Sequence, residues 1–263
     1  MLFLMFKKII QRFILFFPEM IQKNIYKLWI FFHRPKLISA NKHYTYTDED
    51  LKFVHILEGI NYLRIAGSGG LLPQTYFEFG CHSGRTFSAA VNAGNYFGMT
   101  NAQYYAFDSF EGLPETKSDD DGFFETGTFS TSRSDFVNYV ELKTGLRLDD
   151  KCIIQGFYSD SLTSDLQALM PKAGIVHIDV DLYSSTVDVL RFIKPLLVQG
   201  TLLIFDDWYC FPGGSLKGER RALTEFLADN IGISVEPWKA YSTFGQSFFV
   251  TKLPDNLTIS ERA

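Results

Sequence analysis

Residues 76–84 read Tyr-Phe-Glu-Phe-Gly-Cys-His-Ser-Gly, a hydrophobic run that gives way to glycine and small polar residues. The aromatic start suits a buried strand, and Gly80 and Gly84 allow a turn in which the backbone comes close to a ligand. Residues 85–90 begin a helix whose positive N-terminal end faces this turn, so a carboxylate or phosphate group could bind there. An ordinary strand-to-helix turn is the alternative, because a short glycine motif is not specific by itself.

The spacing of the glycines narrows the class of ligand. Gly80 and Gly84 form Gly-x-x-x-Gly with Glu78 two residues before the first glycine. This is not the Gly-x-Gly-x-x-Gly pattern of a dinucleotide-binding fold. An acid just ahead of a loose glycine turn resembles the first motif of the class I S-adenosylmethionine-dependent methyltransferases.

The composition indicates a globular protein. The chain has 263 residues, of which 46% are hydrophobic, with 26 Phe and 13 Tyr. We expect one α/β domain over residues 46–263, preceded by an extension over residues 1–45. A net charge of −5 gives no electrostatic footprint for nucleic acid. Three scattered cysteines indicate neither a disulfide framework nor a zinc cluster, which is typical of a cytoplasmic protein.

The N-terminal extension is basic and hydrophobic at once. Residues 1–38 hold seven Lys and Arg residues against a single acid, Glu19. These charges interrupt any apolar run of the roughly 20 residues that a membrane-spanning helix needs. The pattern predicts two short amphipathic helices separated by Pro18. Such helices suit either the surface of an anionic membrane or packing on the domain or on a second subunit, and both alternatives remain open.

Two further predicted strands lead to candidate donor-binding residues. The strand over residues 103–107 ends at Asp108, followed by Ser109. In open α/β folds an acid at this position accepts hydrogen bonds from ribose hydroxyls. Capping of a helix or a turn by Asp108 is the alternative. The third strand leads to Phe157 and Ser159, which are candidates to flank an adenine ring.

Acidic residues also follow the next two predicted strands. The fourth strand, over residues 174–178, runs into Asp179 and Asp181, and the fifth delivers Asp206 and Asp207. Strand alternation would point Asp179 and Asp181 the same way at the ligand edge of the sheet. Crowded carboxylates are costly unless a proton or a cation relieves them, so the pattern predicts Mg²⁺, which prefers oxygen ligands. Helix capping or solvation of these acids is the alternative.

The remaining segments complete the expected domain. Residues 46–64 have a helix start and helical spacing, and this helix would cover the sheet or the ligand mouth, with His55 packed or on the surface. Residues 115–134 form a long loop, either a lid or a solvated insertion. Two closing strands, 234–237 and 246–251, would form an antiparallel hairpin that completes a seven-stranded sheet.

Four motifs occur in a characteristic order: Phe-Glu-Phe-Gly at 77–80, Phe-Asp-Ser-Phe-Glu-Gly-Leu-Pro at 107–114, His-Ile-Asp-Val-Asp-Leu-Tyr at 177–183 and Asp-Asp-Trp at 206–208. Together they resemble the macrocin-O-methyltransferase family of sugar O-methyltransferases, over roughly residues 74–250. The resemblance implies a Rossmann-like class I methyltransferase fold, with a seven-stranded, mostly parallel sheet, one antiparallel strand and helices on both faces. It also implies S-adenosylmethionine as methyl donor, Mg²⁺ as cofactor and a sugar or glycan-linked hydroxyl as acceptor.

The resemblance also assigns roles to residues. Asp179, Asp206 and Asp207 would be the metal ligands. The catalytic base follows from the residues and not from the resemblance: Asp179 is preferred, Asp181 beside it is the alternative, and His82 and His177 are weaker candidates. The donor-binding residues would lie at the glycine turn, at the end of the second strand and after the third strand: Glu78, Gly80, His82, Ser83, Gly84, Asp108, Ser109, Phe157 and Ser159.

Three other functions are kept for comparison. The acceptor of the methyl group could be a small secondary metabolite. A nicotinamide-dependent oxidoreductase would share the strand–glycine–helix start, but it would leave the carboxylate cluster without a purpose. A non-catalytic, membrane-attached binding module would explain the N-terminal extension but not the acids gathered at the edge of the sheet.

Overall fold

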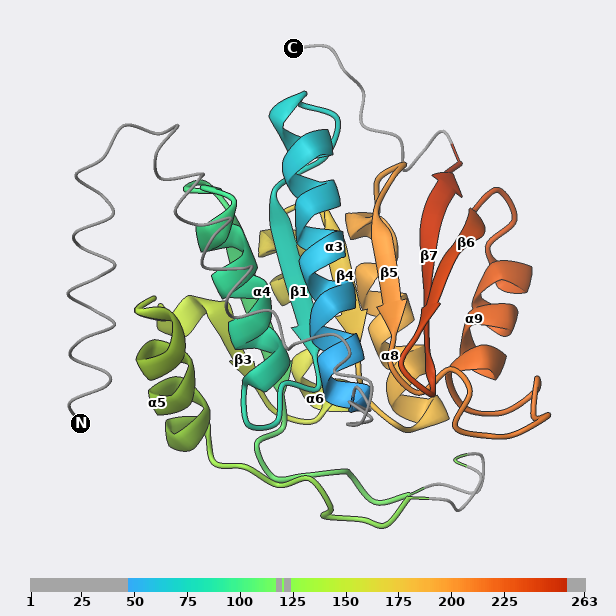
Figure 1. The fold of residues 1–263 in the computed structure, drawn as a ribbon. Coiled ribbons are helices and arrows are strands. Elements are labelled where there is room, and N and C mark those ends of the chain that lie inside the picture. Colours follow the sequence, from blue (N-terminus) through green and yellow to red (C-terminus); the bar gives the residue numbers. More distant parts are fainter. Residues whose placement is uncertain (1–46, 117–119, 121–123, 255–263) are drawn as a thin grey trace, which may run out of the picture. The chain divides into compact units, whose positions relative to one another are not determined.

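A computed structural model describes residues 47–116, 120 and 124–254 (Figure 1). The predicted amphipathic helices of the N-terminal extension lie outside these residues, so their contacts with membrane or protein stay a prediction. The described residues contain one sheet, in the order β3-β2-β1-β4-β5-β7-β6. Its strands are β1 (Thr75–Phe79), β2 (Gln103–Asp108), β3 (Ile153–Gln155), β4 (Ile175–Ile178), β5 (Leu202–Phe205), β6 (Ser234–Tyr241) and β7 (Gly245–Lys252).

The pairing of the strands confirms the predicted topology. Strands β1 to β5 pair in parallel, whereas β7 runs antiparallel to β5 and joins β6 in a hairpin. Strand β1 lies between β2 and β4, so the chain builds the sheet outward from β1 in both directions. In an open α/β sheet, ligands bind at the carboxyl ends of the strands beside such a reversal.

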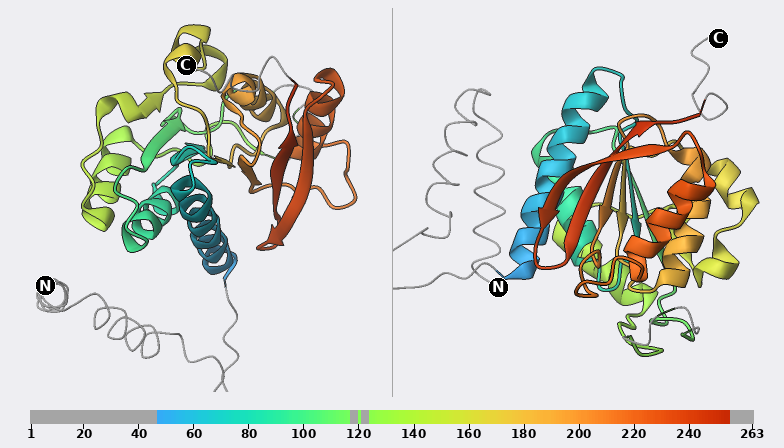
Figure 2. Two further views of the ribbon diagram at one scale, coloured as in Figure 1. Left: turned by 90° about the horizontal axis from the view of Figure 1, so that it is seen from above. Right: turned by 90° about the vertical axis from the view of Figure 1, so that its right-hand side faces the viewer.

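Helices cover both faces of the sheet (Figure 2). Helices α3 and α4 pack together on one face, with α5 beside α4, and α8 and α9 pack together on the other. The described helices are α3 (Asp48–Ser68), α4 (Arg85–Tyr96), α5 (Arg133–Thr144), α6 (Tyr158–Ser161), α7 (Ser164–Leu169), α8 (Tyr183–Ile193) and α9 (Gly218–Asp229), with short 3₁₀ turns η1 (Asp150–Cys152) and η2 (Lys194–Leu196).

The alternation of buried side chains along the strands divides the core into two layers. Tyr76 and Ile175 point to the face of α3 and α4, whereas Phe77 and Val176 point to the face of α8 and α9. All five residues of β1 are buried, as expected for a central strand covered by helices on both sides. The sheet is thus held rigidly from both faces, which fixes the positions of the loops at its carboxyl edge.

Helix α3 begins as the sequence predicts and ends later. Its first turn is closed by a capping box in which Thr47 accepts from the Asp50 amide and Asp50 accepts from Thr47. It continues through Gly67, so the predicted glycine joint is partly helical. His55, on the inner face of α3, stacks on Tyr241, which confirms a packed histidine.

The described part of the predicted long loop, residues 115, 116, 120 and 124–134, contains no helix or strand up to residue 132, whereas its last two residues already belong to α5. Asp120 from this loop is buried, and its carboxylate accepts hydrogen bonds from the amide and the hydroxyl of Ser184, at 2.8 and 3.0 Å. This contact fastens the loop to the N-terminus of α8. None of the described helices combines the length and apolar character needed to cross a bilayer.

Candidate active site

A cavity of about 340 Å³ lies at the carboxyl edge of the sheet. Its lining joins residues after β2 and β3, including Asp108, Ser109 and Phe157, to four acids after β4 and β5, namely Asp179, Asp181, Asp206 and Asp207. A second cavity, of about 280 Å³, shares five lining residues with the first: Lys52, Gly80, His82, Asp179 and Asp206. The topology therefore brings the predicted donor-binding and metal-binding groups into one continuous region.

Close packing of neighbouring atoms requires glycine at both ends of the turn after β1. Gly80 has φ of +83°, and a Cβ atom there would lie 1.7 Å from the carbonyl oxygen of Asp179. Gly84, the N-cap of α4, has φ of +78°, and a Cβ atom there would lie 2.9 Å from the ring of Phe136. Gly80 also lines both cavities, whereas Gly84 lines neither. Helix packing, not a ligand, is therefore the reason for Gly84.

Asp108 fastens this turn to the end of β2. Its carboxylate accepts hydrogen bonds from the amides of Cys81 and His82, both at 2.7 Å, and from the amide of Phe110 at 2.8 Å. A carboxylate has about four acceptor positions, so three amide bonds leave room for one hydroxyl. The predicted ribose contact stays a prediction, whereas the alternative that the sequence offered, capping of a turn by Asp108, is confirmed by these three bonds.

Of the two residues expected beside an adenine ring, Phe157 and Ser159, only Phe157 lines the larger cavity. Ser109 and Phe157 line the larger cavity, whereas Ser159 is exposed on α6 outside both cavities. Tyr158, which the sequence reasoning missed, lines the cavity instead and donates a hydrogen bond to the carbonyl of Phe107 at 3.2 Å.

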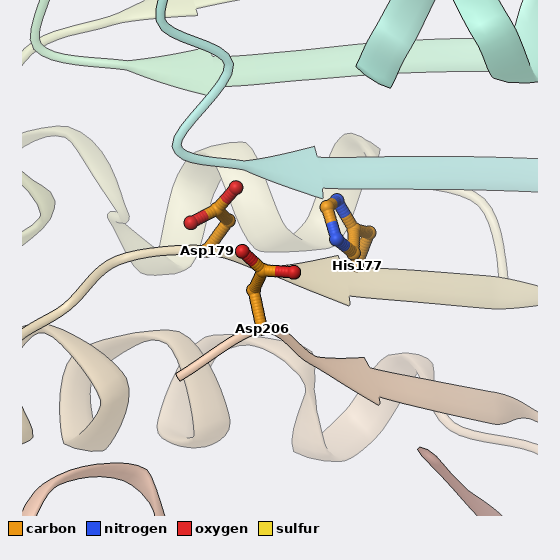
Figure 3. Close-up of side chains that lie close together, drawn as sticks. All are labelled: His177, Asp179 and Asp206. Atoms are coloured by element: carbon orange, nitrogen blue, oxygen red, sulfur yellow. The ribbon is translucent and has the colours of Figure 1, made fainter. Parts of the chain in front are cut away.

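Three side chains from the carboxyl ends of the adjacent strands β4 and β5 lie close together: Asp179 and Asp206 line the cavity, and His177 is buried beside them (Figure 3). One possible ligand atom from each of His177, Asp179 and Asp206 lies within 4.8 Å of the others. Backbone hydrogen bonds continue the sheet past the strand ends, since the Asp179 amide donates to Phe79 and the Asp206 amide to Ile178. The two carboxylates are thereby held side by side on neighbouring strands.

A lysine from α3 lies between these carboxylates. The Lys52 Nζ atom is 3.0 Å from Asp179 Oδ2 and 2.5 Å from Asp206 Oδ2. Burial alone would lower the pKa of Lys52, but the charges of the two carboxylates outweigh it and raise that pKa above its usual value. Burial likewise opposes ionisation of Asp179, and Lys52 outweighs it, so the pKa of Asp179 lies below its usual range.

Lys52 does not compensate the other acids of the cluster fully: burial, followed by the charge of Asp179, raises the pKa of Asp206 although Asp206 contacts Lys52. Burial, followed by the charges of Asp179 and Asp206, raises the pKa of Asp181 to about 8. Burial and neighbouring carboxylates, Asp181 first, also raise the pKa of Asp207. Asp207 Oδ2 is buried without a partner among the described residues, and its amide donates to Glu219 at 3.0 Å.

Asp179 and Asp181 line the same cavity, as predicted, but for a different reason. Strand β4 ends at Ile178, so strand alternation does not extend over Asp179 and Asp181. Asp181 instead has φ of +60°, and the turn that contains it is what directs both residues into the same cavity. A non-glycine residue with this conformation costs energy and is found preferentially at functional sites.

Glu78 lies beneath the site and lines neither cavity. It is fully buried, accepts a hydrogen bond from the Tyr76 hydroxyl at 2.5 Å, and lies 3.6 Å from Nδ1 of His177. Its predicted contact with the methionine part of the donor therefore has no support from its position. Ser83 lines only the second cavity, while His82 lines both.

The donor atoms at the carboxylate end fit a divalent cation. The described residues there supply several carboxylate oxygens, one of them the buried, unpartnered Oδ2 of Asp207. Both ring nitrogens of His177 are also buried without a hydrogen-bond partner among the described residues. Oxygen-rich sites suit Mg²⁺, and an imidazole ligand extends the choice to Mn²⁺ and other transition metals. The predicted trio and the observed trio differ, because His177 replaces Asp207 in the closest group.

Sequence reasoning missed Lys52 and Glu219, which reach the acids from helices on opposite faces of the sheet: Lys52 pairs with the carboxylate of Asp206, and Glu219 accepts from the amide of Asp207. One signal for Lys52 was available: it is the only Lys or Arg between Thr47 and Leu63, on a helix expected to cover the ligand mouth. No comparable signal marks Glu219, which belongs to a charged run at the start of α9.

The sheet order, the glycine turn after β1 and the acid at the end of β2 define a class I methyltransferase fold. Comparison with known proteins agrees. The profile of the macrocin-O-methyltransferase (TylF) family matches residues 73–234, and the chain belongs to this family.

A curated relative is a tetracenomycin rhamnosyl 4'-O-methyltransferase from Streptomyces olivaceus, which is 29% identical over 122 residues. This match spans 42% of the present chain and 44% of the relative, so less than half of the relative's length is compared. Among solved structures, the O-methyltransferase NovP is similar with a TM-score of 0.58 and 19% identity, over 76% of this chain and 79% of NovP. A calicheamicin methyltransferase follows with a TM-score of 0.55 and 17% identity, over 75% and 77% of the two chains. These two structural likenesses show the fold.

Proposed function

We propose that this protein transfers the methyl group of S-adenosylmethionine to a hydroxyl group of a sugar, with Mg²⁺ held by Asp179, Asp206 and Asp207. The observation that carries the proposal is the single cavity that joins Asp108 and Phe157 to the carboxylate cluster. Methyl transfer needs both ends, because the donor sulfonium and the activated hydroxyl must meet within van der Waals distance.

The donor end suits an adenosyl group and a methionine tail. Phe157 offers a ring for the adenine, and Asp108 has acceptor capacity for a ribose hydroxyl. The methionine tail would run past Gly80 toward the N-terminus of α4, which has no side-chain cap. Free amide groups at a helix N-terminus favour a carboxylate, and His82 and Ser83 lie beside this end in the second cavity.

The carboxylate end suits activation of an alcohol. A divalent cation bound there would lower the pKa of a coordinated hydroxyl and fix its orientation. Asp181 lines the cavity and accepts no hydrogen bond from the described residues, so we assign it as the base that takes the hydroxyl proton. The hydroxyl oxygen then attacks the methyl carbon, the new C–O bond forms as the S–C bond breaks, and S-adenosylhomocysteine leaves.

The names of related proteins support a sugar as the acceptor. The Streptomyces olivaceus relative is named for methylation of a rhamnosyl group, and the calicheamicin methyltransferase, CalS11, is titled a TDP-rhamnose 3'-O-methyltransferase in a second structure, with a TM-score of 0.51. Sugars of small natural products, sugar nucleotides and glycans all present neighbouring hydroxyl groups. The acceptor class is therefore proposed as a sugar diol, whatever carries it.

Calorimetry with S-adenosylhomocysteine, with and without Mg²⁺, tests both ends of the cavity. We expect binding of S-adenosylhomocysteine but not of NAD, and a Mg²⁺ signal that disappears in an Asp206→Ala/Asp207→Ala variant. The matched control is Asp149→Ala/Asp150→Ala, an adjacent acidic pair outside both cavities. Failure of the folded protein to bind S-adenosylhomocysteine would contradict the methyltransferase assignment.

Transfer of labelled methyl groups to a panel of acceptors tests the acceptor class. The panel would contain deoxythymidine-diphosphate rhamnose, a rhamnosylated aromatic polyketide, a lipid-linked oligosaccharide and a catechol. We expect label on one or more sugar-bearing compounds. Label on the catechol alone would replace the sugar assignment by methylation of a small aromatic metabolite.

A further inference from the structure

The ammonium group of Lys52 lies where a bound cation would be expected. It contacts one oxygen of Asp179 and one of Asp206, on two adjacent strands, and its side chain is only 19% exposed. Among the described residues that line the larger cavity, Lys52 is the only Lys or Arg. Without this charge, four acids would share one partly buried region.

A divalent cation and this ammonium group cannot use the same oxygens together. Mg²⁺ binds carboxylate oxygen at about 2.0–2.1 Å, and two positive charges a few ångströms apart repel strongly in a partly buried site. Metal binding to Asp179 and Asp206 therefore requires Lys52 to move away. Conversely, Lys52 lowers the free energy of the metal-free state and weakens metal binding.

The rest of the first turn of α3 is anchored, so the lysine can move without the helix. Asp48 accepts hydrogen bonds from the amide and the hydroxyl of Thr243, at 3.1 and 2.6 Å, and Glu49 pairs with Arg85. These contacts tie the helix start to the β6–β7 turn and to α4. A lysine has a flexible four-carbon stem, so its ammonium group can be repositioned by side-chain rotation alone.

The second cavity offers a place for the displaced ammonium group. Lys52 lines this cavity as well as the first, and the carboxylates of Asp48 and Glu49 belong to the same lining. Lys52 therefore borders two regions that each contain carboxylates, and in the second region Arg85 pairs with Glu49.

We propose that Lys52 is the internal counter-cation of the carboxylate site, that it occupies this site in the metal-free protein, and that a divalent cation displaces it into the second cavity. The inference rests on the proposed metal site. It makes Lys52 a determinant of metal affinity, with no direct part in the methyl transfer.

Manganese binding to variants of the full chain tests the proposal. Mn²⁺ affinity would be measured by electron paramagnetic resonance for the wild type, Lys52→Met, Lys52→Arg and the control Lys239→Met. Lys239 pairs with Glu58, further along the same helix and outside both cavities. Loss of the competing charge should tighten Mn²⁺ binding about tenfold or more in Lys52→Met. Lys52→Arg and Lys239→Met should stay near the wild-type value.

Amine labelling of the wild-type protein gives a second test that needs no variant. Saturating Mg²⁺ should increase the modification of Lys52 by an amine-reactive reagent, read by mass spectrometry, about threefold or more, because the ammonium group leaves its ion pairs. Modification of Lys239 should not change. This measurement keeps the proposal testable if Lys52→Met does not fold.

The outcomes separate this inference from the proposed function. Equal or weaker Mn²⁺ binding by Lys52→Met, or unchanged labelling of Lys52 with Mg²⁺, would overturn the role of Lys52 while the metal site stands. Absence of Mn²⁺ binding from the wild type and all variants would overturn the metal site and this inference together, while S-adenosylhomocysteine binding would still test the donor site. If Lys52→Met bound Mn²⁺ and the wild type did not, the inference would be supported, because removal of the Lys52 charge would then be required for metal binding.

Discussion

The two ends of the cavity satisfy their carboxylates in opposite ways. At the donor end, Asp108 accepts three backbone amide hydrogen bonds, so its charge is compensated by groups that cannot move away. At the other end, Asp179 and Asp206 depend on the mobile charge of Lys52, and Asp207 keeps an unpartnered oxygen. The hydrogen bonds of Asp108 hold a fixed turn. At the other end, the protein does not neutralise all of the negative charge of the carboxylates, so a cation is needed to do so.

The largest expected effect separates chemistry from donor binding. Asp181→Asn keeps the size of the side chain but removes the proposed base, so methyl transfer should fall about a thousandfold, within the usual range for a general base. The affinity for S-adenosylhomocysteine should stay within about twofold, because Asp108 and the glycine turn are unchanged. Steady-state kinetics and calorimetry measure the two quantities.

The control for this substitution is Asp188→Asn, which alters an acid on α8 that pairs with Arg191 outside both cavities. Its activity should match the wild type. If Asp181→Asn retained most of its activity, another group would have to accept the proton, and Asp179 would be the next candidate.

Removal of a carboxylate should change the free energy of unfolding in opposite directions at the two ends of the cavity. Asp108→Ala leaves three amides without their charged acceptor and should lower the free energy of unfolding by about 3 kcal/mol. Asp207→Asn removes a buried carboxylate from a like-charged group and should raise it by about 1 kcal/mol in the absence of divalent cations.

Denaturant unfolding in the presence of a chelator measures both values. A destabilised Asp207→Asn protein would mean that its carboxylate is already compensated without metal. Near-equal stability of Asp108→Ala and the wild type would mean that the turn does not depend on Asp108.

A comparably small effect concerns the residues that pack behind the carboxylate end. His55 is buried against Tyr241, whose hydroxyl lies 3.1 Å from Asp206 Oδ1. Burial, followed by the charges of His177 and Lys239, lowers the pKa of His55 to about 4. Glu58 lies 3.8 Å from its Nδ1 atom but is exposed and paired with Lys239, so burial dominates.

The sign of the pH dependence follows from this shift. The unfolded chain binds a proton at His55 near pH 6.5 and the folded protein only near pH 4, so stability is present above pH 6.5 and is lost as the pH falls between these values. By pH 5 the loss should reach about 1–2 kcal/mol relative to pH 7. His55→Phe should keep the stacking and lose this part of the pH dependence in unfolding experiments at the two pH values; an unchanged pH dependence would contradict the assignment.

Much of the fold could be predicted from local sequence. Strand patterns located all seven strands of the described sheet, and the glycine turn and the acids after the strands marked its carboxyl edge. These features are readable because side-chain periodicity reports burial, and because parallel strands must place their carboxyl ends at one edge. The sequence by itself therefore determined the class of fold and the acids that border the cavity.

The partners of those acids were decided only by the tertiary structure. Lys52 precedes Asp179 by 127 positions, and Glu219 reaches Asp207 from the other face of the sheet. A helical pattern shows that α3 covers the sheet but not which side chain enters the site, because that depends on how the helix is rotated and packed. For the same reason Glu78 lies beneath the cavity beside His177, whereas the sequence placed it with the donor.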